Sequence, residues 1–101
     1  MARNPGNFDA YVVYDADDQD LRVIPPVAVV SRNFSIRNMS GFNVDVSCAG
    51  LNIRATTIAD GKHDSFAADT PGFYAYTVTA TVNGSLRKAR GASDPKVIVD
   101  A

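Results

Sequence analysis

The residues that could support hydrolytic chemistry lie in one short segment, where Asp60, His63, Asp64 and Ser65 fall within six positions. A Ser-His-Asp triad needs side chains that converge from separate, rigid elements beside an oxyanion hole. Polar residues gathered around an Asp-Gly pair, here Asp60-Gly61, are instead typical of an exposed turn. The sequence therefore predicts no catalytic residues and a protein that is not an enzyme.

A second group of chemically active side chains is acidic and consists of Asp15, Asp17, Asp18 and Asp20. Carboxylate oxygens at this density could act as calcium ligands. An EF-hand loop, however, has a glycine at its sixth position and a bidentate glutamate at its end, and the chain contains no glutamate. A solvated turn between two strands is the preferred interpretation, and calcium binding is the alternative.

The composition indicates one all-β domain over residues 1–101. All 11 acidic residues are aspartate, while valine, threonine and asparagine are plentiful, so strand and turn formers outnumber helix formers. A chain of 101 residues has room for one hydrophobic core. A net charge of -1 predicts neither nucleic-acid nor membrane-surface binding, and the apolar runs are far shorter than the roughly 18 residues of a transmembrane span.

The expected location is cytoplasmic. The first residues, Met1-Ala-Arg-Asn-Pro-Gly, lack the apolar core of a secretory signal, although a signal removed earlier would make the protein secreted. The single cysteine excludes an internal disulfide, which agrees with a reducing compartment. Cys48 alternates in register with apolar residues, so we expect a buried, inert thiol.

Alternation of apolar and polar residues predicts the strands. The clearest example runs from Pro71 to Ala80, and another begins at Phe8, with Phe8, Ala10, Val12 and Tyr14 on its inward face. The residues expected to point inward across the sheets are Tyr74, Tyr76, Val78, Ile36, Val44, Val46 and Val97.

Turn signals divide these strands. Pro25-Pro26 predicts a corner at which the chain leaves one sheet and joins the other, because proline cannot donate to a sheet ladder. The turn at 38–41 predicts a hairpin between the strands on either side of it. Asn83-Gly84 predicts a tight hairpin, after which Ser85 to Arg90 returns antiparallel, and Lys96 to Asp100 supplies the closing strand.

The segment Gly72-Phe-Tyr74-Ala-Tyr76-Thr-Val78, followed by Lys96-Val-Ile-Val99, resembles the carboxyl-terminal half of the cupredoxin family, where a Gly-x-Tyr-x-Tyr-x-Cys strand precedes the copper loop. Phe34–Asn38, a short turn and Phe42-Asn-Val44 are similar to the family's strand, asparagine, turn and first copper histidine. The resemblance implies a single Greek-key β-sandwich of about seven or eight strands. An immunoglobulin-like order is the alternative, because sandwiches share this pattern.

The copper ligands of that family are not carried over. A blue-copper centre needs two histidines and a cysteine, whereas this chain has one histidine, and Val78 stands in the cysteine position. Phe42 or Asn43 stands in the position of the first histidine. We therefore expect a metal-free protein without a cofactor. A site pooled from Cys48 and His63 of two chains would require both side chains to be exposed.

These observations predict a non-enzymatic interaction module that recognises a protein partner or associates with itself. A metal-binding protein (copper or calcium) or a redox protein of cupredoxin type is the alternative. Two charged segments of opposite sign could also let identical chains associate head to tail. The residues predicted to contact the partner are Arg87, Lys88, Arg90, Asp17, Asp18 and Asp20.

Overall fold

The computed structural model describes residues 8–89 and 95–100, which form eleven strands and one turn of 3-10 helix, η1 (Ala49–Leu51). The strands are β1 (Ala10–Asp15), β2 (Asp20–Ile24), β3 (Val27–Val30), β4 (Arg32–Asn38), β5 (Val44–Cys48), β6 (Ile53–Ile58), β7 (His63–Ala68), β8 (Gly72–Ala75), β9 (Thr77–Val82), β10 (Ser85–Lys88) and β11 (Lys96–Val99). The predicted all-β fold class is confirmed.

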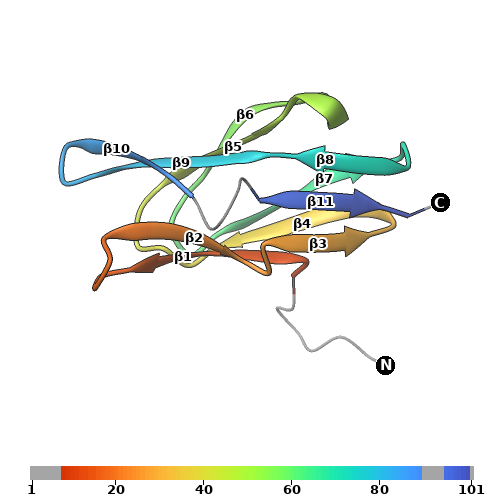
Figure 1. Ribbon diagram of the computed structural model, residues 1–101. Helices are drawn as coiled ribbons and strands as arrows, with labels where there is room; N and C mark the ends of the chain where they lie inside the picture. The colour runs from red at the N-terminus through yellow and green to blue at the C-terminus, as the bar shows by residue number, and fades with distance from the viewer. Residues whose placement is uncertain (1–7, 90–94, 101) are drawn as a thin grey trace.

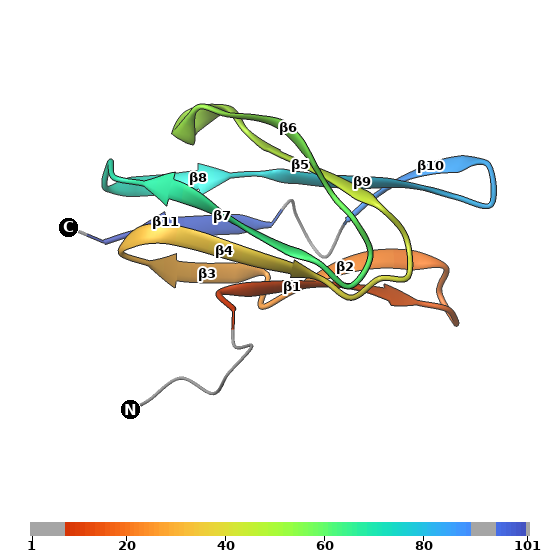
Figure 2. The same ribbon diagram turned by 180° about the vertical axis from the view of Figure 1, so that it is seen from behind.

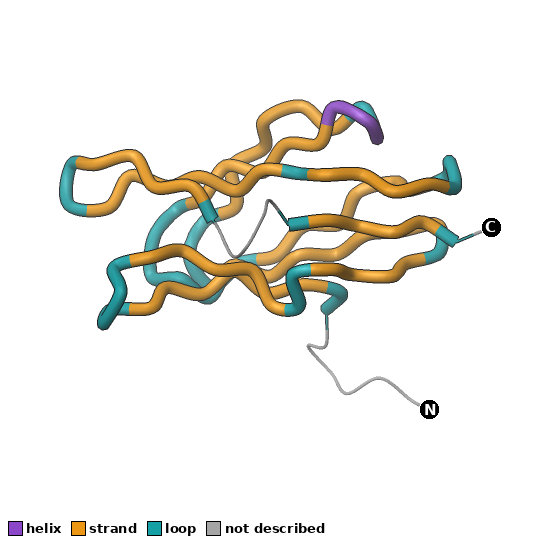
Figure 3. Tube along the Cα trace, in the orientation of Figure 1, coloured by secondary structure: helices purple, strands orange, loops and turns teal. Residues whose placement is uncertain are grey.

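The strands form a β-sandwich built from three sheets (Figures 1 and 2). One sheet has the order β2-β1-β4-β7, the second β10-β9-β5-β6 and the third β3-β11-β8. The second and third sheets are joined because β8 runs directly into β9, with only Tyr76 between them (Figure 3). Most pairs are antiparallel, but β1 pairs with β4 and β3 with β11 in parallel.

Alternate residues of these strands fill a shared core. Of the seven residues predicted to point inward, six are buried, and Tyr74 is half-buried against the core. Phe34 of β4 meets Tyr76 edge to face, with ring centroids 5.1 Å apart. The period-2 pattern therefore identified the buried faces because each strand has one side against this core.

The proline pair forms the predicted corner. β2 belongs to the first sheet and β3 to the third, and Pro25-Pro26 lies between them. The Ile24-Pro25 peptide is cis. The predicted hairpin at Asn83-Gly84 is also confirmed, since both residues have positive φ and Ser85 pairs with Val82. Arg90 lies outside the described residues.

The predicted hairpin at 38–41 is wrong. β4 pairs with β1 and β7 in the first sheet, whereas β5 pairs with β6 and β9 in the second, so the chain crosses between layers here. The buried Asn38 side chain stabilises the crossing, because its amide donates to the carbonyls of Phe42 at 2.6 Å and Ile58 at 2.8 Å. Asn38, at the end of β4, therefore links this strand to the residues before β5 and to the end of β6, neither of which pairs with β4.

Two further expectations need correction. The described residues contain eleven strands rather than seven or eight. One reason is that the run through Tyr76 forms two strands with different neighbours. β8 pairs with β11, whereas β9 pairs with β5 and β10. Phe8 precedes β1 and does not join the inward face. Its ring packs against Tyr11 and His63, with centroids 5.9 and 4.7 Å away.

Candidate functional site

The polar segment at 60–65 is not one turn. His63, Asp64 and Ser65 belong to β7, where successive side chains point to opposite faces of the sheet. Asp60 is used structurally, because its Oδ1 accepts the Gly41 backbone N–H at 2.8 Å. These polar residues therefore do not converge on one point, and the hydrolytic interpretation gains nothing from the geometry.

The acidic residues surround the turn between β1 and β2: Asp15 ends β1, Asp17 and Asp18 lie in the loop, and Asp20 begins β2. Asp15 Oδ1 accepts the Asp17 backbone N–H at 3.0 Å, and the Arg22 guanidinium contacts Asp18 at 2.7 Å and Asp15 at 3.5 Å. The carboxylates of Asp15 and Asp18 thus already lie next to the positive charge of Arg22. Within residues 8–89 and 95–100, no three histidine, cysteine or acidic residues form a group that could hold a metal ion.

Cys48 is buried, as expected, with 1% of its surface exposed, and its Sγ lies 3.5 Å from the Ala75 carbonyl oxygen. A metal site shared between two chains through Cys48 and His63 would need an exposed thiol, and Cys48 does not meet that condition. Tyr76 lies beside it, and burial, with a smaller contribution from the Cys48 thiol, raises the pKa of the Tyr76 hydroxyl well above its ordinary value.

Other groups occupy the positions that correspond to copper ligands. Val78 is fully buried in the core. The Phe42 ring packs edge to face on Tyr14, with centroids 5.2 Å apart, and Asn43 Oδ1 accepts the Asp60 backbone N–H at 3.2 Å. The side chains of Val78, Phe42 and Asn43 are therefore each in contact with other parts of the protein.

The two predicted charged segments lie at the same end of the sandwich. In Figures 1 and 2 the β1–β2 loop and the β9–β10 turn project from that end, and β10 lies against β2. Asp17 and Asp18 are exposed and Asp20 is half-buried. A head-to-tail association through these segments is therefore not what the geometry favours, because it requires complementary patches at opposite ends.

The basic strand β10 also differs from expectation. Lys88 is exposed, but Arg87 is half-buried, and its Nε is fully covered without a hydrogen-bond partner among the described residues. Arg87 pairs across the ladder with Ala80, whose side chain faces the core, so the two side chains share that face. Leu86 points the other way and is 74% exposed.

An apolar surface that the sequence did not predict crosses the third sheet. The ladder places Val29 of β3 and Phe73 of β8 on either side of Ile98 of β11. Val29 is 61% and Phe73 77% exposed, while Val97 and Val99 point into the core. One row of large apolar side chains therefore lies on the outer face of this sheet, across all three strands.

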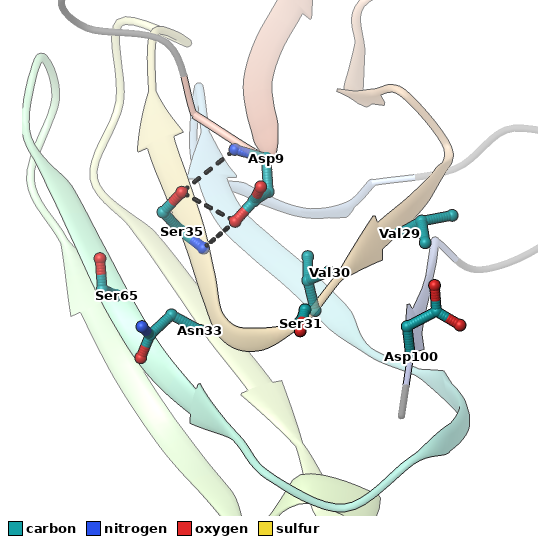
Figure 4. A pocket seen from close by; sticks show the side chains of 8 residues that line it. All are labelled: Asp9, Val29, Val30, Ser31, Asn33, Ser35, Ser65 and Asp100. Carbon is teal, nitrogen blue, oxygen red and sulfur yellow. Dashed lines mark hydrogen bonds between the residues drawn. The ribbon is translucent and has the colours of Figure 1, made fainter. Parts of the chain in front are cut away.

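A polar groove of about 660 Å³ lies beside this sheet (Figure 4). It is lined by Asp9, Val29, Val30, Ser31, Asn33, Ser35, Ser65 and Asp100. The Asp9 carboxylate accepts the Ser35 backbone N–H at 2.9 Å and the Ser35 hydroxyl at 3.0 Å. The groove is open, and its hydroxyl and carboxylate groups come from surface strands and loops.

Comparisons with known proteins gave no family. A scan against protein-family models found no match, and a search of the curated proteins found none either. Among the described residues, no helix has the length and apolar character needed to cross a membrane.

Proposed function

We propose that the protein is a non-enzymatic β-sandwich module that binds a protein partner or a second copy of itself. The observation that carries the proposal is the apolar row on the outer face of the third sheet, in which Val29 and Phe73 are exposed on either side of the half-buried Ile98. Covering large apolar side chains removes them from water, which favours association. Scattered single apolar residues need no such explanation, but a row aligned by strand pairing forms a continuous surface.

The edge strands of this sheet support the same function. β2, β6, β7 and β10, the edges of the other two sheets, each carry at least one charged side chain. β3 and β8, the edges of the third sheet, carry none. Charges on edge strands discourage contact with other chains, so the third sheet is the part of the surface least protected against association.

We also propose a cupredoxin-like strand order that carries no copper chemistry. Its support is the two parallel pairs, because a constant-type immunoglobulin sandwich consists of antiparallel sheets. Val78 and Phe42, at two of the ligand positions, offer no atom that coordinates copper. Metal analysis tests this part: stoichiometric copper in the purified protein that is lost in a Cys48→Ser variant would overturn it.

The charged end is a secondary contact in this proposal. Lys88 of β10 and Asp17 and Asp18 of the β1–β2 loop are exposed, and β10 contacts β2. Exposed charges of this kind change the rate and the salt dependence of association more than its final affinity. They therefore steer a partner, whereas the apolar row supplies the free energy of binding.

The experiment is capture of partners from the native host by the immobilised protein, at low and high salt. Val29→Ser with Phe73→Ser should reduce the recovered partners strongly, since both side chains are exposed and the fold does not need them. Lys88→Ser with Arg90→Ser should reduce recovery only at low salt. Arg87 is left unchanged in this variant because it is half-buried.

Leu86→Ser is the matched control, because Leu86 is 74% exposed but lies on another sheet. It should capture the same partners as the natural protein. If all variants recover the same proteins at the same yield, the apolar row is not a contact surface and the proposal is wrong.

A further inference from the structure

We propose that the outer face of the third sheet binds a second copy of this chain, around a twofold axis that places the two β11 strands antiparallel, face to face. This inference rests on the proposed function, because it names the partner of that surface. It follows from the arrangement of charged and apolar residues along β11.

The residues on this face follow from the ladder. In β11 the side chains of Lys96 and Ile98 alternate with buried Val97 and Val99. Asp100, the residue after the strand, continues the pairing, because its backbone N–H donates to the Val30 carbonyl at 2.8 Å. The strand therefore presents a cation, an apolar residue and a carboxylate in a line.

The neighbouring strands complete three rows across the face. The ladder places Val27 and Ala75 beside Lys96, and Val29 and Phe73 beside Ile98. Asp100 lies in the third row, next to Ser31 in the continuation of the parallel ladder. Ile98 is thus the centre of the surface, with one charge of each sign on opposite sides of it.

Only one twofold arrangement of this face is complementary in charge. An axis in the plane of the interface, through Ile98 and across the strands, reverses β11 and puts Lys96 of one copy opposite Asp100 of the other, twice. An axis along β11 would put Lys96 opposite Lys96 and Asp100 opposite Asp100, which is repulsive. The charge pattern selects the first arrangement.

The same axis aligns the apolar row with itself. Val29 meets Val29, Ile98 meets Ile98, and Phe73 meets Phe73, which is the geometry of two sheets packed face to face. Aromatic side chains near the centre of an interface contribute much of its binding free energy. A three-stranded face is small, however, and interfaces below about 1,200 Å² of total buried area are weak. We therefore expect a dimer with a dissociation constant of roughly micromolar or weaker.

Charge complementarity also distinguishes a second copy from other occupants. An anionic membrane surface or a nucleic acid would be repelled by Asp100 as much as it is attracted by Lys96. A surface with one charge of each sign, placed symmetrically about an apolar centre, is complementary to itself. The chain itself is therefore the partner that the observed residues fit.

The test is sedimentation velocity of the purified chain at concentrations up to about 500 µM, at low salt. The natural protein should shift from monomer to dimer as concentration rises. Phe73→Ser should weaken the dimer at least about tenfold. Lys96→Asp and Asp100→Lys should each weaken it by about fivefold or more, and the double exchange Lys96→Asp with Asp100→Lys should restore it, because the pairs re-form with reversed sign.

Lys62→Asp is the matched control, since Lys62 is exposed on the loop between β6 and β7, and it should leave the dimer unchanged. Circular dichroism of each variant verifies that it is folded. A chain that stays monomeric throughout, or a double exchange that does not restore association, overturns the inference. If such a monomer still captures host proteins through Val29 and Phe73, the proposed function stands and the partner is another protein.

Discussion

Two junctions in this sandwich bury a polar side chain to the same extent but treat it in opposite ways. At the crossing from β4 to β5, Asn38 is 0% exposed, and at the change from β8 to β9, Tyr76 is 1% exposed. Both residues stand where the chain changes its neighbouring strands. The two residues differ in whether their buried polar groups form hydrogen bonds.

Asn38 uses its full hydrogen-bonding capacity. Its Nδ2 donates to the carbonyls of Phe42 and Ile58, and its Oδ1 accepts the Ser40 backbone N–H at 3.0 Å and the Ser40 hydroxyl at 2.7 Å. The Tyr76 hydroxyl has no hydrogen-bond partner among the described residues. The hydrogen bonds of Asn38 therefore stabilise the crossing from β4 to β5. The Tyr76 ring fills the core, but burying its hydroxyl without a partner lowers the stability of the fold.

The largest effect that tests this comparison is expected at Asn38. Asn38→Ala removes four hydrogen bonds and leaves the carbonyls of Phe42 and Ile58 without this donor, so the free energy of unfolding should fall by about 3 kcal/mol. Urea denaturation measures the change. Asn33→Ala, an exposed asparagine on the same strand, should change it by less than about 0.5 kcal/mol. An equal decrease in the free energy of unfolding of both variants would show that the hydrogen bonds of Asn38 do not stabilise the crossing.

The two junctions also show how far the sequence could predict the fold. Alternation identified Tyr76 and Val78 as inward-facing because it depends only on the two faces of one strand. It could not show that the strand through Tyr76 pairs with β11 in its first half and with β5 in its second, because pairing depends on residues far away in the sequence. The hairpin predicted around Asn38 failed for the same reason.

The candidate surface was partly visible in the sequence. The outward face of each strand carries an apolar residue, namely Val29, Phe73 or Ile98. Such a residue can be recognised from the alternation within its own strand. Their alignment into one row appears only when the register of β3, β11 and β8 is known. Arg87, by contrast, was predicted to contact the partner, but its position opposite Ala80 turns its side chain toward the core.

A smaller effect is expected from pH. Burial keeps the Tyr76 hydroxyl neutral above its ordinary pKa of 10.0, so above that pH the unfolded chain loses a proton that the native protein retains. The native state should therefore lose about 1.4 kcal/mol per pH unit from this residue as the pH rises beyond 10.0, and nothing below it. Denaturation as a function of pH should show a shallower decline in Tyr76→Phe than in Tyr74→Phe, which retains Tyr76. Identical slopes would contradict the assignment.

The smallest effect separates two tyrosines on one continuous run of chain. Tyr76→Phe removes a buried hydroxyl that has no partner, so at neutral pH the free energy of unfolding should rise by up to about 1 kcal/mol, because the ring and its contact with Phe34 remain. Tyr74→Phe removes a hydroxyl that donates to the Thr70 carbonyl oxygen at 2.8 Å, and it should lower the free energy by about 0.5 kcal/mol.

The opposite signs are the informative result, because the two variants make the same chemical change two positions apart. Thermal or urea unfolding at neutral pH measures both. If Tyr76→Phe destabilises the protein as much as Tyr74→Phe, the Tyr76 hydroxyl has a partner in solution, such as a buried water molecule. The junction at Tyr76 would then be satisfied in the same way as the crossing at Asn38, and the difference between the two junctions would disappear.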